Sequence, residues 1–147
     1  MRILVDGHNL IPNLPGLSLG EIDDELALIK LLQVYARQSR HQVEVFFDGA
    51  PPGKAGARVY APVTARFVSA RTIADNAIRS HLESLGSQAK ETLVVSSDRQ
   101  VQAEARSLGA KTQSSDQFAR EMISPRGGVR NANVSPLTSS VAPAASS

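Results

Sequence analysis

Aspartates recur along the chain at the points where short apolar segments give way to polar ones. They are Asp6, Asp48, Asp75, Asp98 and, after a last short segment, Asp116. Carboxylates that are brought together repel one another unless a cation lies between them. Because Mg²⁺ and Mn²⁺ prefer all-oxygen ligands, a fold that gathers these residues builds a site for such an ion.

Most of these aspartates also have an ordinary structural role open to them. Asp75 and Asp98 fall in predicted first helical turns, where the helix dipole favours a carboxylate, and Asp116 fits the same role further on. Asp48 precedes a glycine, as in many turns. Asp6 has no such role, because it ends a predicted strand and no strong helical pattern follows it.

Two neighbours of Asp6 are polar as well. Asn9 offers an amide that could hold a carboxylate or a phosphate, whereas His8 is expected to pack as a neutral ring or to make a minor contact. The 3 histidines show no metal-ligand spacing. The absence of cysteine excludes disulfides, thiolate zinc sites and cysteine nucleophiles.

Short apolar runs and helical patterns alternate along the part of the chain that carries these residues. Strands are expected at 2–5, 43–47, 66–69, 92–96 and 111–113. Three helices are expected to follow N-terminal caps at 18, 72 and 97 and to run to about 38, 85 and 108, and a last helix is expected at about 115–123. Capping signals are seen at Ser18, Thr72 and Ser97, and 49–62 is predicted as a loop broken by Gly and Pro. This alternation predicts an α/β fold with a mainly parallel sheet of about five strands and helices on both faces. The carboxyl ends of parallel strands share one edge, where ligands bind.

The charge of the chain is distributed unevenly. There are 16 Lys and Arg against 14 Asp and Glu, but two of the arginines, Arg126 and Arg130, lie in the segment 124–147, which has no acid. Without that segment the charges balance, which excludes a polybasic nucleic-acid binder. The segment 124–147 is rich in Ser, Pro and Ala and is predicted to be a disordered tail, so the folded domain is predicted to span 1–123.

Basic residues are concentrated instead in the middle of the domain. Seven of them, against three acids, lie between Arg37 and Arg79. A basic segment beside an acidic metal pocket suits a phosphodiester, although an ordinary solvated surface explains many of these arginines equally well. The candidate phosphate contacts are Lys54, Arg58, Arg71 and Arg99.

Four motifs resemble those of the YacP-like NYN domains, a branch of the PIN-like ribonucleases. They are Leu4-Val5-Asp6-Gly7-His8-Asn9-Leu10-Ile11, Phe46-Phe47-Asp48-Gly49, Ala74-Asp75-Asn76-Ala77-Ile78 and Val94-Val95-Ser96-Ser97-Asp98-Arg99. The resemblance covers about residues 1–123. It implies a PIN-like three-layer α/β/α sandwich and a metal-dependent endoribonuclease. By position, Asp6, Asp75 and Asp98 would be catalytic and bind Mg²⁺ or Mn²⁺, with Asn9, Asp48 and, more loosely, Asp116 as accessory residues.

Two functions follow from this resemblance. The first is cleavage of single-stranded RNA by metal-activated water. The second is an RNA-binding PIN-like module with weakened or no nuclease activity, which could dock on a ribosome or another RNA complex, because Asn76 stands where the family often has a second acid. A receiver-like or phosphoryl-transfer protein is disfavoured, since no second acid lies near Asp6. Without a long apolar run or a signal-peptide pattern, a cytoplasmic protein with no membrane partner is expected.

Overall fold

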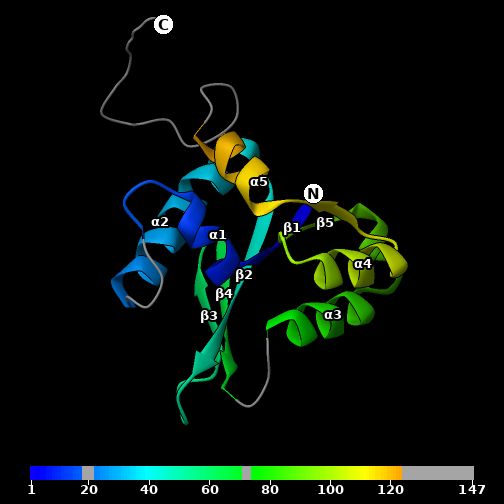
Figure 1. Cartoon of the computed structure of the whole chain (residues 1–147), viewed down its shortest axis with the longest axis horizontal. Coiled ribbons are helices and arrows are strands. Elements are labelled where there is room, and N and C mark those ends of the chain that lie inside the picture. The colour runs from blue at the N-terminus through cyan, green and yellow to red at the C-terminus, as the bar shows by residue number, and fades with distance from the viewer. Residues whose placement is uncertain (18–21, 71–73, 124–147) are drawn as a thin grey trace, which may run out of the picture.

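A six-stranded sheet in the order β3-β4-β2-β1-β5-β6 forms the centre of the computed structural model (Figure 1). The structure describes residues 1–17, 22–70 and 74–123, without the side chains of residues 22 and 74–76. The strands are β1 (Arg2–Asp6), β2 (Gln42–Ala50), β3 (Gly56–Tyr60), β4 (Val63–Ser69), β5 (Thr92–Val95) and β6 (Lys111–Gln113). Neighbouring strands are parallel throughout, except that β3 is antiparallel to β4.

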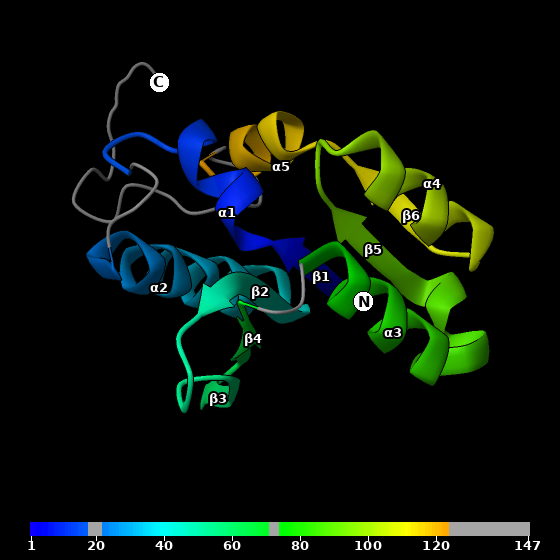
Figure 2. The same ribbon diagram turned by 60° about the horizontal axis from the view of Figure 1, so that its bottom comes forward.

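Helices cover both faces of this sheet. They are α1 (Gly7–Leu10), α2 (Ile22–Ser39), α3 (Ala74–Leu85), α4 (Arg99–Ser107) and α5 (Ser115–Met122), with 3₁₀ turns η1 (Ile11–Asn13) and η2 (Gly86–Glu91). Helices α2 and α5 lie on one side and α3 and α4 on the other (Figure 2). None of the described helices combines the length and the apolar character needed to span a bilayer.

Each face has its own apolar core because side chains alternate along the strands. In β1, Ile3 and Val5 pack towards α2 and α5, whereas Leu4 packs towards α3 and α4. All three are at most 1% exposed, as expected of a parallel strand that is covered on both faces. The predicted three-layer α/β sandwich is therefore confirmed.

The prediction that 49–62 is a loop is wrong. The segment contains β3, an antiparallel edge strand that adds a sixth strand to the sheet. An edge strand needs no continuous apolar run, and Val59 in its middle is 74% exposed. The strand β2 also continues through Asp48 to Ala50, with an irregularity in its pairing to β4 after Phe47. Asp48 therefore lies within a strand rather than after one.

Of the three predicted helix caps, only the one at Ser97 lies in the described residues, and it is wrong. Helix α4 is capped by Asp98 and not by Ser97, because the Asp98 side chain accepts hydrogen bonds from the backbone N–H groups of Gln100 and Val101. The expected caps at Ser18 and Thr72 lie outside the described residues, as does the predicted tail 124–147. The expected helices themselves are present in their described parts.

Gly7 lies where the chain bends from β1 into α1, tightly against Phe47. A Cβ at this position would lie 2.5 Å from Phe47 Cε1 and 3.0 Å from the Phe46 carbonyl oxygen. We expect Gly7→Ala to lower the free energy of unfolding by about 1–3 kcal/mol, because a buried ring and a central strand must move. Urea denaturation measures this loss.

Gly16→Ala is the control for this substitution. Gly16 has a positive φ of 82°, but nothing lies within 4 Å of the position that a Cβ would occupy there. Its loss should therefore be limited to the backbone strain of about 1 kcal/mol. Equal losses at the two positions would show that the contact with Phe47 is not what requires glycine.

Candidate active site at the carboxyl edge of the sheet

The strand order of the sheet reverses between β1 and β5. The chain forms β2, β3 and β4 on one side of β1, then crosses to the other side of β1 and forms β5 and β6. In open α/β sheets, ligands bind outside the carboxyl ends of the strands at such a point. Asp6 ends β1 and residues 96–98 follow β5, so the sequence places two of the predicted acids there.

A buried hydroxyl links these two acids. Ser96 is fully buried, and its Oγ donates a hydrogen bond to Asp6 Oδ2 at 3.1 Å. The same Oγ accepts from the backbone N–H of Asp98 at 3.1 Å. Asp98 Oδ1 in turn accepts from the first turn of α4, which fixes its side chain at the start of that helix.

Asn9 ties together the loops that follow three strands. Its Oδ1 accepts from the backbone N–H of Ser97 and from the hydroxyl of Ser115, both at 2.7 Å. The backbone N–H of Ser115 donates to Ser97 Oγ at 2.9 Å, which closes the connection. These bonds engage the oxygen of Asn9, so a ligand would meet this residue through its NH₂ group.

His8 is held between two carboxylates, contrary to the expectation of a minor contact. Its Nδ1 lies 2.7 Å from Asp48 Oδ1 and its Nε2 lies 2.5 Å from Glu25 Oε2. Partial burial lowers the pKa of His8, but the hydrogen bonds with Glu25 and Asp48 outweigh this effect and raise it above 6.5. Through these two contacts His8 connects Glu25 on α2 with Asp48 on β2, close to Asp6.

Asp6 carries a charge that the described protein groups compensate poorly. Burial raises the pKa of Asp6 to about 6; the hydrogen bond from Ser96 opposes this effect and the nearby charge of Asp48 adds to it. A desolvated carboxylate beside a second carboxylate favours a bound cation. The carboxylate oxygens of Asp6 and Asp98 are donors of the kind that Mg²⁺ and Mn²⁺ select, but the described carboxylates do not by themselves form a group that could hold such an ion.

The third predicted metal ligand, Asp75, lies in the first turn of α3, but its side chain is outside the described part of the structure, and so is Arg71. Among the described side chains, no group of three or more His, Asp or Glu could hold a metal ion. Because the side chain of Asp75 is not one of them, the trio of Asp6, Asp75 and Asp98 stays a prediction.

Asp116 is exposed in the first turn of α5. The hydrogen bond with Ser114 lowers the pKa of Asp116, and Arg120 lies 3.4 Å from its carboxylate. It follows Ser115, which is hydrogen-bonded to Asn9, so it lies near the site in sequence. Among the described residues, Asp116 forms its ion pair with Arg120 on the same helix.

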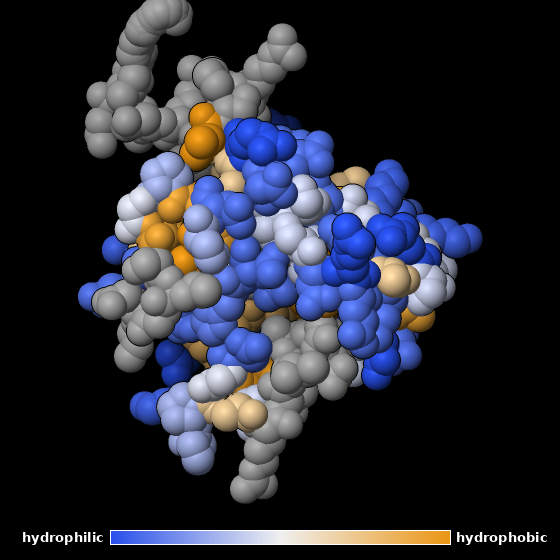
Figure 3. All heavy atoms as spheres, viewed as in Figure 1, coloured by the Kyte–Doolittle hydropathy of each residue, from blue (hydrophilic) through white to orange (hydrophobic). Residues whose placement is uncertain are grey.

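The predicted phosphate contacts that the structure describes lie on different elements. Lys54 is exposed in the turn between β2 and β3, and Arg99 is the exposed first residue of α4. Arg58 is not on a loop but on β3, with its guanidinium 4.9 Å from the centre of the Phe67 ring. The surface over α3 and α4 is mostly hydrophilic (Figure 3).

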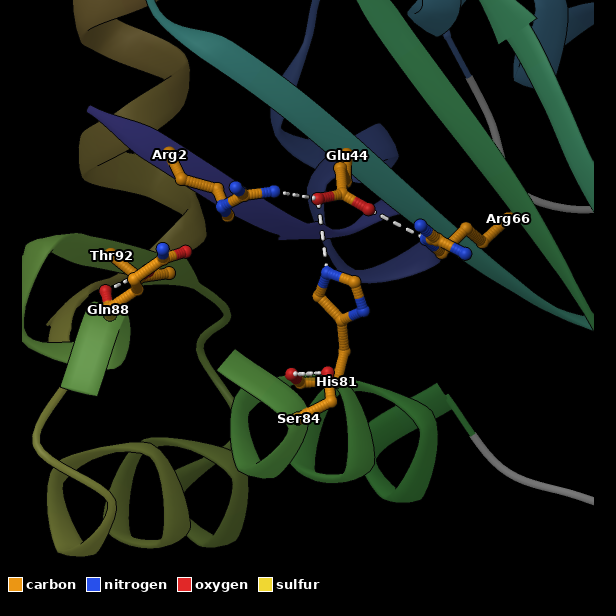
Figure 4. Close-up of polar contacts among 7 residues, drawn as sticks. All are labelled: Arg2, Glu44, Arg66, His81, Ser84, Gln88 and Thr92. Carbon is orange, nitrogen blue, oxygen red and sulfur yellow. Dashed lines mark hydrogen bonds and ion pairs between the residues drawn. The ribbon is translucent and has the colours of Figure 1, made fainter. Parts of the chain in front are cut away.

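Glu44, which the sequence reasoning missed, is the centre of a second polar cluster. It lies on β2, is only 6% exposed, and accepts hydrogen bonds from three side chains on other elements (Figure 4). The distances are 2.9 Å to Arg2, 2.7 Å to Arg66 and 3.1 Å to His81. Burial raises the pKa of Glu44, but Arg66, His81 and Arg2 outweigh this effect and hold it below 4.5. An acid inside the apolar run of β2 was the available signal.

Comparisons with known proteins agree with this fold. The family model of the YacP-like NYN domain matches residues 3–139. A crystal structure of Rae1 (YacP) from Bacillus subtilis is similar, with 26% identity and a TM-score of 0.68 over 82% of this chain and 72% of that one. The crystal structure of a Rae1 point mutant is similar too, with 25% identity and a TM-score of 0.67 over 82% of this chain and 73% of that one. No curated protein matches this chain.

Proposed function

The chain belongs to the YacP-like NYN domain family, and we propose that it is a metal-dependent endoribonuclease that cleaves single-stranded RNA. Family membership and the Rae1 structures support a ribonuclease-type function with RNA as the substrate. One observation carries the more specific proposal. The desolvated carboxylate of Asp6 is linked through the Ser96 hydroxyl to the backbone N–H of Asp98, beside the point where the strand order of the sheet reverses.

In this proposal Asp6, Asp75 and Asp98 hold Mg²⁺ or Mn²⁺. When bound, such an ion lowers the pKa of a coordinated water and stabilises the charge that develops on the phosphate. The protein's own groups prepare the site for it. The hydroxyl of Ser96 orients the Asp6 carboxylate, and Asn9 holds the loops after β5 and β6 in place.

The remaining predicted residues have supporting roles in the proposal. Asp48 adds negative charge beside Asp6, and Asp116 stays an accessory acid at the start of α5. The cations that would contact the RNA backbone are Lys54, Arg58, Arg71 and Arg99. The nuclease domain is proposed to comprise residues 1–123, and the segment 124–147 to be an appendage to it.

A second candidate function is RNA binding without cleavage, on free RNA or on a ribosome or other RNA complex. Two observations favour it. Asn76 provides no charge where the family often has an acid, and Asp98 Oδ1 already accepts two backbone hydrogen bonds. Both features reduce the charge and the oxygen lone pairs that remain for a metal ion.

Asp98→Asn tests the proposed cleavage. Asparagine caps a helix as well as aspartate does, so α4 and the fold should be retained while one negative charge is lost. We expect cleavage of 5′-labelled single-stranded RNA in Mn²⁺ to fall by more than the roughly 10- to 100-fold that outer-shell changes cost. Gel analysis with and without EDTA measures the rate.

Glu83→Gln is the matched control, because it also removes one carboxylate but from an exposed position on α3. It should cleave at the rate of the unmodified protein. If Asp98→Asn cleaves equally fast, the activity comes from a contaminating nuclease. If the unmodified protein binds RNA and never cleaves it, the second candidate function is correct.

A further inference from the structure

An open groove lies between α3 and the strands β4 and β3, on the sheet face that α3 partly covers. Its volume is about 430 Å³, within the roughly 300–1,000 Å³ of small-molecule sites. Phe46 and Val68 are among the sheet residues that line it, and Ala77, Ser80 and His81 line it from α3. Arg66 lines it from β4.

The lining combines an apolar surface with cationic and hydroxyl groups. Among the described residues that line the groove there is no Asp or Glu. The guanidinium of Arg66 and the ring of His81 both contact the buried Glu44 (Figure 4). Arg2, which does not line the groove, contacts the same carboxylate, so two guanidinium groups share one negative charge and the Glu44 cluster has a net positive charge.

This combination suits one nucleotide of a single-stranded RNA. An unstacked base is recognised by apolar and planar side chains, whereas its phosphate is bound by guanidinium and hydroxyl groups. Arg66 contacts Glu44 through Nε, so its terminal NH₂ groups can donate to a phosphate. Glu44 fixes the arginine in the groove and limits the rotamer entropy that is lost on binding.

The groove adjoins the candidate active site. Phe46 is the register partner of Asp6 across β1 and β2, and the groove-lining helix α3 begins with Ala74-Asp75. A strand of RNA whose scissile phosphate lies at the acids would therefore have a neighbouring nucleotide at this groove.

We propose that the groove binds the nucleotide that flanks the scissile phosphate in single-stranded RNA. This inference rests on the proposed function for the identity of the ligand. The Arg66 guanidinium and the absence of acids among the described lining residues favour RNA over an acidic or purely apolar partner.

Charge substitutions at Ser80 test the proposal. Ser80 lines the groove and is exposed on α3, so Ser80→Glu and Ser80→Lys both place good helix formers at a solvated position. We expect Ser80→Glu to weaken, and Ser80→Lys to strengthen, binding of a fluorescein-labelled oligouridine by about three- to tenfold at low salt. Fluorescence anisotropy in EDTA measures the Kd without cleavage.

The matched control is the same pair of substitutions at Gln38, which is exposed on α2 on the opposite side of the sheet. Shifts at Gln38 should be smaller and within about twofold, because the RNA phosphates lie far from it. Equal shifts at Ser80 and Gln38 would overturn the proposal. So would an RNA duplex that binds as tightly as the oligouridine with the same dependence on Ser80, because a paired base cannot enter the groove.

The experiments distinguish a wrong groove proposal from a wrong nuclease proposal. If cleavage depends on Asp98 but binding ignores the charge at Ser80, the groove proposal is wrong and the nuclease stands. If binding follows the charge at Ser80 but the unmodified protein cleaves nothing in Mn²⁺, the nuclease is wrong and the groove stands.

Discussion

Asp6→Asn is expected to abolish RNA cleavage and, in the absence of metal, to make the folded protein more stable above pH 6. The loss of cleavage should be on the order of 10²–10³-fold or more, because the proposed central ligand loses its charge. The gain in stability follows from burial, which raises the pKa of Asp6 from 3.8 to about 6. The asparagine oxygen can still accept the hydrogen bond that Ser96 donates to Asp6.

The pH dependence of this gain has a definite sign. Between pH 3.8 and about 6 the unfolded chain releases the Asp6 proton, whereas the folded state still holds it. The unfolded state therefore binds fewer protons, and the stability of the unmodified protein falls as the pH rises through this window. The pKa shift of Asp6 lowers the free energy of unfolding by about 3 kcal/mol above pH 6. It has no effect on the free energy of unfolding below the pKa that Asp6 has in the unfolded chain.

Urea denaturation in EDTA at several pH values measures both curves. The asparagine variant should match the unmodified protein at low pH and exceed it at pH 8. Added Mg²⁺ or Mn²⁺ should stabilise the unmodified protein more than the variant, because an ion that binds only the folded state adds its binding free energy. A variant that is less stable at pH 8 would show that the desolvated charge is compensated by another group.

The sequence predicts the central strands well and the edge poorly, for a physical reason. β1 and β5 are buried on both faces and so appear as continuous apolar runs. β3 is paired on one side only, and its exposed residues give no such run. Only Ala61 and Pro62 separate β3 from β4, so the pairing is local, but the residues of β3 form no apolar pattern that would predict a strand.

In the candidate site, the sequence predicted which residues are present but not the hydrogen-bond partners that they have in the fold. The rule that strand ends share an edge placed Asp6 and Asp98 together from the sequence. The hydrogen bond from Ser115 to Asn9 joins residues 106 positions apart, and only the register of the sheet creates it. Ser96 could have been suspected as a polar residue that ends an apolar strand, but its two partners could not.

The number of basic residues in the middle of the chain exceeds the number of basic side chains that are free to contact RNA. Arg79 pairs with Glu104 at 3.3 Å, and Arg37 donates to the Ala61 carbonyl. These arginines have partners within the domain, which a count of charges cannot reveal. Lys54, in the turn between β2 and β3, and Arg58, on β3, are both exposed, as a contact with a phosphate backbone requires.

The second large effect is expected at Glu44, where Glu44→Gln should lower the free energy of unfolding by about 2–4 kcal/mol at pH 7. Removing one partner of a buried ion pair typically costs about 3–5 kcal/mol. The loss is smaller here because the side chains of Arg2 and Arg66 are 30% and 38% exposed and can reach water. Urea denaturation measures it, with Glu83→Gln as the exposed control.

The pH dependence and a double-mutant cycle distinguish this cluster from a simple packing effect. The three partners hold the pKa of Glu44 below 4.5, so its stabilisation is present above that value and is lost as the pH falls through the folded pKa. The difference between Glu44→Gln and the unmodified protein should therefore vanish in acid. Arg66→Gln should also cost less in the Glu44→Gln background than alone, because the shared contact is already gone. Additive losses that persist in acid would mean that Glu44 acts through its shape and not through its charge.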